Sequence, residues 1–358
     1  MVQTDVGNFA QRKRDDMVWK NKKSILYSIL ELALIPAGNS AADIFKNVKE
    51  VAQRAEKLGY TRFWLAEHHN SVAIASSATS VLIGDVAGVT KTIRVGSGGI
   101  MLPNHSPLII AEQFATLALL YPNRIDLGLG RAPGTDQLTA TAIRPDRMRS
   151  VLNFPEEIMQ IQQYLSMSNR GSKVRVPFGE GVNLPMYILG SSTDSAYLAA
   201  EMGLPYAFAS HFSTTHLSEA LSIYRKQFKP STHLKQPYTI AGVNIIVSES
   251  NEDAERELTS LIRMFYGVLT GVPDFIQAPV PMSPEIKEVW KHPQVQQMLK
   301  YTFYGDHQTV KTKAIEFLAQ TQADELMIVS NQYSHKARVR SFESFAAIMK
   351  EINEFGLT

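Results

Sequence analysis

From residue 24 onward, short runs of β-branched and aromatic residues alternate with longer stretches of helical periodicity. This alternation is typical of βα units that build a parallel sheet. It predicts strands at residues 25–33, 62–67, 93–100, 124–129, 186–189, 206–210, 240–248 and 325–330. It predicts helices at residues 42–58, 76–89, 108–120, 194–202, 215–228, 251–265, 310–320 and 335–353. Eight such units favour a closed (β/α)₈ TIM barrel over an open doubly wound sheet, which more often has five or six strands.

Two connections between these elements are longer than usual. They cover residues 169–184, before the fifth strand, and residues 267–304, between the seventh and eighth strands, where five prolines occur. Connections of this length are usually lids or appended subdomains. We therefore expect residues 24–358 to form a single barrel domain with insertions, preceded by a flexible leader over residues 1–23.

Composition narrows the classes of partner. The formal net charge is +2, and residues 1–23 contribute +3 of it, so the remainder is near −1 and offers no basic face for nucleic acid. Glu31 interrupts the apolar run at 25–34, and no stretch offers the roughly 18 apolar residues of a membrane span. The chain has no cysteine, which excludes disulfides and thiolate metal sites. We expect a cytoplasmic protein that binds neither nucleic acid nor membrane.

A barrel of this kind carries its active site at the C-terminal ends of its strands. The second strand ends in Glu67, His68 and His69. Neighbouring strand residues face opposite sides, so the two histidines are not expected to share a metal, and no third ligand follows at zinc spacing. Either one histidine faces the cavity as an acid, a base or a hydrogen-bond donor, or both only cap the strand end.

Glycines mark the next two strand ends. Gly98 and Gly99 lie within the third strand, where glycine indicates either a close approach of a ligand to the backbone or a packing corner of the barrel. After the fourth strand, the glycine spacing and Pro133 do not fit a dinucleotide-binding turn. Arg131 in this loop is expected to face an anion, the alternative being a surface ion pair.

An anion site is also predicted directly after the fifth strand. There Leu189 and Gly190 are followed by Ser191, Ser192 and, three residues later, Ser195 at the start of a helix. Free backbone N–H groups at a helix start bind anions, and phosphate is the best candidate here. The alternative is ordinary N-capping by a serine.

Taken together, these segments resemble the bacterial luciferase-like monooxygenase family, from about residue 24 to the C-terminus. The closest likeness is to an uncharacterised bacterial subgroup rather than to light-emitting luciferase. The resemblance rests on residues 62–70, 96–107, 124–136, 189–192, 204–212 and 323–327.

The resemblance implies FMN bound at the barrel mouth, reduced by a separate flavin reductase and reacting there with O₂. It implies that His68 is the active-site histidine and that Arg131 contacts the phosphate. It also implies a phosphate loop at Leu189, Gly190, Ser191, Ser192 and Ser195, and a non-prolyl cis peptide at Gly98–Gly99 beneath the ring. No cysteine lies near Gly130, so light emission is not expected.

The expected function is that of an FMN-dependent monooxygenase that oxidises a small organic substrate through a C4a-(hydro)peroxyflavin. Two alternatives stay open: hydride transfer with a deazaflavin (F420), and a non-catalytic flavin-binding protein. Helices 42–58 and 76–89 are rich in Ala, Val, Ile and Leu, and barrels of this family commonly pair near here. We therefore expect a homodimer.

Overall fold

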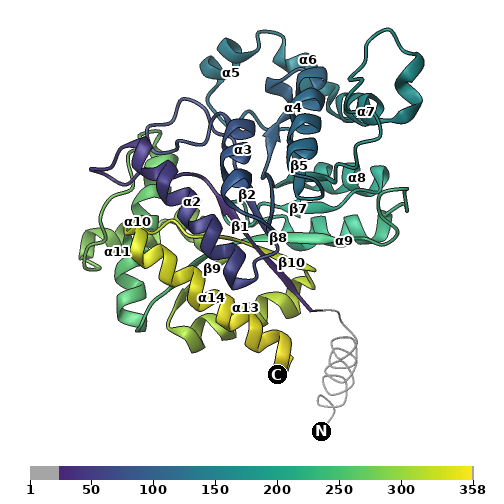
Figure 1. Ribbon diagram of the computed structural model, residues 1–358. Coiled ribbons are helices and arrows are strands. Elements are labelled where there is room, and N and C mark those ends of the chain that lie inside the picture. The colour runs from purple at the N-terminus through teal and green to yellow at the C-terminus, as the bar shows by residue number, and fades with distance from the viewer. Residues whose placement is uncertain (1–23, 357–358) are drawn as a thin grey trace, which may run out of the picture.

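The computed structural model describes residues 24–356, and these form a closed barrel of eight parallel strands surrounded by helices (Figure 1). The leader predicted at 1–23 lies outside the described residues. Strand β10 pairs with β1 on one side and with β8 on the other, which closes the sheet and confirms the predicted fold. The barrel strands are β1 (Leu26–Glu31), β2 (Arg62–Leu65), β3 (Arg94–Ser97) with its short continuation β4 (Ile100–Met101), β5 (Ile125–Gly130), β6 (Met186–Gly190), β7 (Tyr206–Phe208), β8 (Thr239–Val247) and β10 (Glu325–Val329).

Each predicted helix is present, with its ends moved by a few residues. Ser40 and Asp43 form a capping box at the start of α2, and Gly59 ends it in the left-handed conformation at φ 85°. These helices are α2 (Ala41–Leu58), α3 (Thr79–Val89), α4 (Pro107–Leu120), α8 (Thr193–Met202), α9 (Leu217–Gln227), α10 (Asn251–Thr270), α13 (His307–Thr321) and α14 (His335–Phe355).

The structure adds elements that the sequence pattern did not predict. Three helices follow β5 and lie together at one end of the barrel: α5 (Gln137–Ile143), α6 (Arg147–Leu152) and α7 (Phe154–Leu165) (Figure 1). The 267–304 insertion is largely ordered rather than irregular, since it contains the end of α10, α11 (Pro284–Lys291), α12 (Pro293–Leu299) and β9 (Thr302–Gly305). Strand β9 pairs with the C-terminal half of β8, outside the closed ring. The 169–184 connection stays irregular after the 3₁₀ turn at Met167–Gly171.

The closed base of the barrel holds a buried ionic network. Arg62 donates to Asp126 and to Glu325, each over 2.8 Å, and Arg94 donates to Asp126 over 2.9 Å. Asp126 and Glu325 are fully buried, and Arg62 is 4% exposed. Burial of charge is costly unless each charge is paired and hydrogen-bonded, and here two cations face two carboxylates. Tyr238 donates to the second oxygen of Glu325 over 2.6 Å.

An apolar layer separates this network from the other end of the barrel. Its members come from six of the eight barrel strands and include Leu30, Trp64, Tyr187, Ala207, Ile240, Met327 and Val329. Beyond it the strand ends open into the loops. Across the described span 24–356, no helix is both long enough and apolar enough to cross a membrane.

The network at the base generates a stability prediction. Arg62→Met keeps most of the side-chain volume but leaves two buried carboxylates short of a cation. We expect the free energy of unfolding to fall by about 3–5 kcal/mol, the usual cost of breaking a buried pair. Urea denaturation followed by circular dichroism measures it. The control is Arg54→Met, because Arg54 pairs with Glu50 on the surface at 2.9 Å, where little change is expected. Equal losses in both variants would contradict the prediction.

Candidate active site

The C-terminal ends of the strands surround a narrow cavity of about 40 Å³. Residues from seven of the eight barrel strands or the turns after them line it, including Leu30, Trp64, Gly98, Leu189, His211, Gly242 and Met327. The Gly98–Gly99 peptide bond is cis, as expected. A Cβ on Gly98 would lie 2.6 Å from a methyl carbon of Leu30 and 3.0 Å from Trp64 Cβ, so any larger residue would require these neighbours to shift. Close packing within the barrel is thus one reason for this glycine. Because Gly98 also lies in the cavity wall, close approach of a ligand to its backbone remains a second reason.

The two neighbouring histidines lie beyond the end of β2 at Leu65 and have different hydrogen-bond partners. His68 is close enough to His211 to lower the pKa of His211. Burial lowers the pKa of His68, against the opposing effect of a hydrogen bond with the backbone of Gly134. His69 turns away and bonds through Nε2 to Glu67 over 2.8 Å. His68 is therefore a neutral imidazole around neutral pH.

Glu67 binds two histidines at once, an arrangement that the sequence did not predict. Its Oε1 lies 2.8 Å from His69 Nε2 and 2.9 Å from His105 Nε2, and its Oε2 accepts from the Met101 N–H over 3.0 Å. Burial alone would raise the pKa of Glu67, but the hydrogen bonds from His105 and His69 outweigh it and lower the pKa to about 2. The carboxylate is thus ionised and ties the loops after β2 and β4 together.

Glu67, His69, His105 and Asn104, which we call the Glu67 cluster, hold the loop that carries Arg131. Asn104 donates to Glu67 over 3.3 Å and to the carbonyl of Pro133 over 2.9 Å. Arg147 donates to the Asn104 side chain over 3.0 Å and to the carbonyl of Arg131 over 3.1 Å. The backbone of the loop is therefore held at the carbonyls of Arg131 and Pro133, while the Arg131 side chain points away to a different partner.

Arg131 and the serine turn after β6 lie together in the structure. The guanidinium makes an exposed ion pair with Asp194, in the first turn of α8, at 3.3 Å. The N-cap residue Ser192 makes no capping hydrogen bond with its side chain, and Ser195 instead donates to the Ser192 carbonyl over 2.7 Å. A Cβ on Gly190 would lie 2.1 Å from Ser195 Oγ, so glycine gives this turn its room. N-capping by serine therefore does not account for the sequence here.

The serine turn thus has the features of an anion site. The first N–H groups of a helix have no intrahelical partner, and the helix dipole favours negative charge beside them. Leu189 and Gly190 end β6, and the half-buried Ser191 follows directly. The carboxylate of Asp194 already occupies this position. The sequence left two roles open for Arg131, an anion contact and a surface ion pair, and the structure contains the ion pair.

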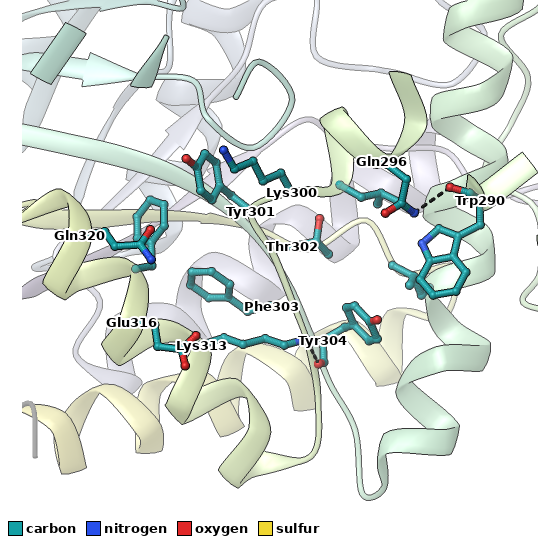
Figure 2. Close-up of a pocket in the computed structure, with 13 residues that line it drawn as sticks. Trp290, Gln296, Lys300, Tyr301, Thr302, Phe303, Tyr304, Lys313, Glu316 and Gln320 are labelled. Carbon is teal, nitrogen blue, oxygen red and sulfur yellow. Dashed lines mark hydrogen bonds between the residues drawn. The ribbon is translucent and has the colours of Figure 1, made fainter. Parts of the chain in front are cut away.

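A separate groove of about 400 Å³ lies outside the barrel, between α12, β9 and α13 (Figure 2). Trp290 and Tyr304 stand on one side of β9, and Lys313 reaches across toward Tyr304 from α13. The Lys313 ammonium donates to the Tyr304 carbonyl over 2.9 Å and lies 3.8 Å from the centre of its ring. None of the predicted site residues lies in this groove, so the barrel mouth is the candidate active site.

Several residues at the mouth were not singled out from the sequence. They are Glu67 in its clamping role, His105, Asp194, His211 and Asn331. His211 stands directly after a predicted strand, within a segment on which the family resemblance rests, so its position was a usable signal. Within residues 24–356, no group of three or more His, Cys, Asp or Glu side chains is arranged to hold a metal ion.

Solved structures share this architecture. The ligand-free protein MsnO8 superposes with a TM-score of 0.80 at 31% identity, covering 91% of this chain and 98% of its own. An FMN complex of the oxygenating constituent of 3,6-diketocamphane monooxygenase gives a TM-score of 0.67 at 14% identity, covering 90% and 97%. An F420-dependent secondary alcohol dehydrogenase gives 0.64 at 16% identity, covering 90% and 98%. At such identities the last two show the fold alone.

Sequence relatives are closer. An uncharacterised protein of Bacillus subtilis, YvbT, is 48% identical over 92% of this chain and 98% of its own length. A luciferase-like monooxygenase of Escherichia coli is 45% identical over the same shares. An N-acetyl-S-alkylcysteine monooxygenase of Bacillus subtilis is 36% identical over 66% of this chain and 72% of its own. The sequence model of the luciferase-like monooxygenases matches residues 28–347, and the chain belongs to that family.

Proposed function

We propose that this protein is an FMN-dependent monooxygenase, which takes FMN reduced by a separate flavin reductase and uses O₂ to oxidise a small organic substrate. The observation that carries the proposal is the meeting of Arg131 with the uncapped start of α8, beside the glycine-walled barrel mouth. A bound reduced flavin supplies the electrons that activate O₂, and the protein supplies binding, orientation and proton management.

The residues at the mouth fit the parts of FMN. Arg131 and the backbone N–H groups at Ser191, Ser192 and the start of α8 would hold the phosphate, since a guanidinium and a helix start both favour an anion. The isoalloxazine ring would lie against Gly98 and Leu189, which with Trp64 and Met327 make the cavity wall apolar. The loop between Gly130 and Asp136 is held by the Glu67 cluster, so Arg131 is presented from a fixed backbone.

His68 is proposed to manage a proton at the cofactor. A neutral imidazole whose pKa is lowered by burial can take up a proton and return it within one turnover. It follows β2 directly and is close enough to the cavity residue His211 to lower the pKa of His211, whereas His69 is engaged by Glu67. The organic substrate is proposed to be a sulfur compound, an aldehyde or a ketone, and the name of the 36% identical relative, an S-alkylcysteine derivative monooxygenase, favours sulfur.

Deazaflavin is the second candidate cofactor, because an F420-dependent dehydrogenase shares the fold. A deazaflavin enzyme transfers hydride and does not activate oxygen. Oxygen consumption above that of free reduced FMN, with NADH and a flavin reductase present, separates the two. Flavin binding without any coupled product would favour a non-catalytic flavin-binding protein instead.

A homodimer is proposed through α3 and α4. Helix α2 corresponds to one of the two helices expected at the interface. Its outward side is charged, with Lys46, Lys49 and Arg54 in ion pairs, which makes it a poor apolar interface. In contrast, α3 and α4 expose large apolar residues: Val81 at 69%, Val89 at 36%, Ile109 at 46%, Leu119 at 52% and Leu120 at 64%. Clustered exposed apolar side chains mark an association surface.

The phosphate site generates a binding prediction. A charge-assisted hydrogen bond from Arg131 contributes about 1.5–3 kcal/mol and the helix start about 0.3–1 kcal/mol, so riboflavin should bind roughly 10- to 10³-fold more weakly than FMN. Arg131→Ala should remove most of this preference, and Arg131→Lys should restore part of it, because lysine keeps the charge but loses the planar fork. Titration calorimetry of the three proteins with both ligands tests this. Equal affinities in the unmutated protein would refute the phosphate site.

The proton role of His68 predicts a split between chemistry and binding. His68→Ala should lower turnover by about 10²- to 10⁴-fold, the usual contribution of general acid–base catalysis, while FMN affinity is retained. Turnover is followed as product-coupled oxygen consumption over a panel of thioethers, aldehydes and ketones. The matched control is His69→Gln, which keeps a hydrogen-bonding group for Glu67 and should stay active. A crippled His69→Gln beside an active His68→Ala would reverse the assignment.

The dimer prediction concerns one exposed apolar residue. Val81→Lys places a charge on the α3 surface and should shift the protein from dimer to monomer, because desolvating an unpaired ammonium opposes association. Light scattering after size-exclusion chromatography measures the mass. Leu138→Lys is the control, since Leu138 is 85% exposed on α5, away from α3 and α4. A monomeric unmutated protein at micromolar concentration would rule out the proposed dimer.

A further inference from the structure

Two buried polar atoms at the barrel mouth have no hydrogen-bond partner among the described residues. They are Nδ1 of His211 and Oδ1 of Asn331. Asn331 is only 7% exposed, so water does not offset the missing bond. Buried polar groups are almost always paired, because an unpaired one loses its hydration without compensation. Two such atoms at one end of one barrel call for a common explanation.

A third side chain joins the two residues. Asn244, on β8, donates through Nδ2 to the backbone carbonyl of His211 over 2.5 Å. Its Oδ1 accepts from Asn331 Nδ2 over 3.5 Å. Asn244 therefore uses both ends of its amide, and each of its neighbours retains one unpaired atom. We refer to His211, Asn244 and Asn331 as the polar cluster.

The barrel wall leaves room for the polar cluster. His211 and Gly242 both line the cavity at the mouth. A Cβ on Gly242 would lie 2.6 Å from His211 Nδ1, so the imidazole occupies the space that a side chain at this position of β8 would fill. The position of His211 inside the mouth thus depends on a glycine in the neighbouring strand.

The polar cluster is uncharged. Burial, followed by the neighbouring His68, lowers the pKa of His211 to about 3, so its ring is neutral and carries one N–H. No Asp, Glu, Lys or Arg lines the cavity. A ligand group that pairs with this cluster is therefore neutral, with an N–H for the oxygen of Asn331 and an acceptor for the imidazole N–H.

The topology places the polar cluster across the barrel from the proposed phosphate site. In the closed ring, β10 stands four strands from β5 in either direction, so the end of β10 before Asn331 faces the end of β5 before Arg131. A ligand that spans the mouth has its anionic group at Arg131 and its far end at the polar cluster. FMN has this polarity, because its ring ends in a neutral pyrimidinedione, with an N–H between two carbonyls.

Resting on the proposed function, we propose that the polar cluster binds the pyrimidinedione edge of the flavin ring. Asn331 Oδ1 accepts from the ring N–H, and the imidazole N–H of His211 donates to an adjacent ring carbonyl. Deazaflavin has the same edge, so the assignment holds for either cofactor. Since a cavity of about 40 Å³ is too narrow for the ring, side chains move as it enters, and the unpaired atoms gain partners in that move.

This assignment separates stability from binding. Asn331→Leu removes the unpaired Oδ1 and, with Nδ2, only the 3.5 Å contact to Asn244, which is at the long limit of a hydrogen bond. The melting temperature of the ligand-free protein should therefore change little, whereas loss of a well-formed structural hydrogen bond would lower it. FMN should bind this variant about 10-fold more weakly, the equivalent of one lost hydrogen bond. His211→Phe should behave in the same way. Calorimetric melting of the ligand-free variants and titration with FMN give the two readouts.

A second probe needs no variant to fold. In 3-methyl-FMN the ring N–H is blocked, so it should bind the unmutated protein about 10-fold more weakly than FMN. In Asn331→Leu the two ligands should bind equally, because the partner of the N–H is gone. The matched control is Asn244→Leu, which removes a fully used amide: it should lower the melting temperature and still distinguish FMN from 3-methyl-FMN.

The outcomes separate this inference from the proposed function. If the unmutated protein binds FMN in preference to riboflavin but binds 3-methyl-FMN as tightly as FMN, the polar cluster does not contact the ring edge and only this inference fails. The same holds if Asn331→Leu lowers the melting temperature and leaves FMN affinity unchanged. If FMN and riboflavin bind alike, the proposed phosphate site fails first, whatever the variants at the polar cluster do.

Discussion

The barrel depends on the buried contact of Arg62 with Asp126 and Glu325. These residues belong to β2, β5 and β10, and β5 and β10 stand opposite each other in the ring. One guanidinium therefore ties opposite walls of the barrel together at its base. Hydrophobic contacts alone are non-directional and would allow strands to slide, whereas charge-assisted hydrogen bonds fix distance and orientation. Together with the backbone pairing of neighbouring strands, this contact fixes the base of the barrel.

With its base held by polar contacts, the barrel can leave its mouth loosely filled. Gly98 and Gly242 lie where larger side chains would close the cavity, and His211 lines it beside them. Outside the ring, the Glu67 cluster fixes the loops that present Arg131. The ionic network at the base, the apolar layer and the mouth thus follow one another along the barrel axis. The candidate active site lies at the mouth.

The sequence predicted the features that follow from the regular spacing of apolar residues in strands and helices. The alternation of strand and helix patterns predicted all eight barrel strands, and glycine at strand ends identified the mouth. Helix α7 was not predicted, although Phe154, Ile158, Ile161 and Leu165 have helical spacing. It is one of three helices between the fourth and fifth barrel strands, where the βα pattern calls for only one. Strand β9 was missed because prolines dominate the insertion. The polar cluster could not be predicted, since its unpaired atoms result from contacts among three strand ends far apart in the chain.

Under the proposed function, in which Arg131 binds the FMN phosphate, the ion pair between Arg131 and Asp194 has a consequence for exchange of the cofactor. Asp194 already places a carboxylate at the start of α8, where the dipole favours it, so an arriving phosphate must take Arg131 from a resident competitor. A site of this design holds its ligand less firmly than one with the same donors and no internal anion. For a flavin that is reduced on another protein, the corresponding gain is speed of departure: after each cycle Asp194 reclaims the arginine, and the spent flavin is free to return to its reductase.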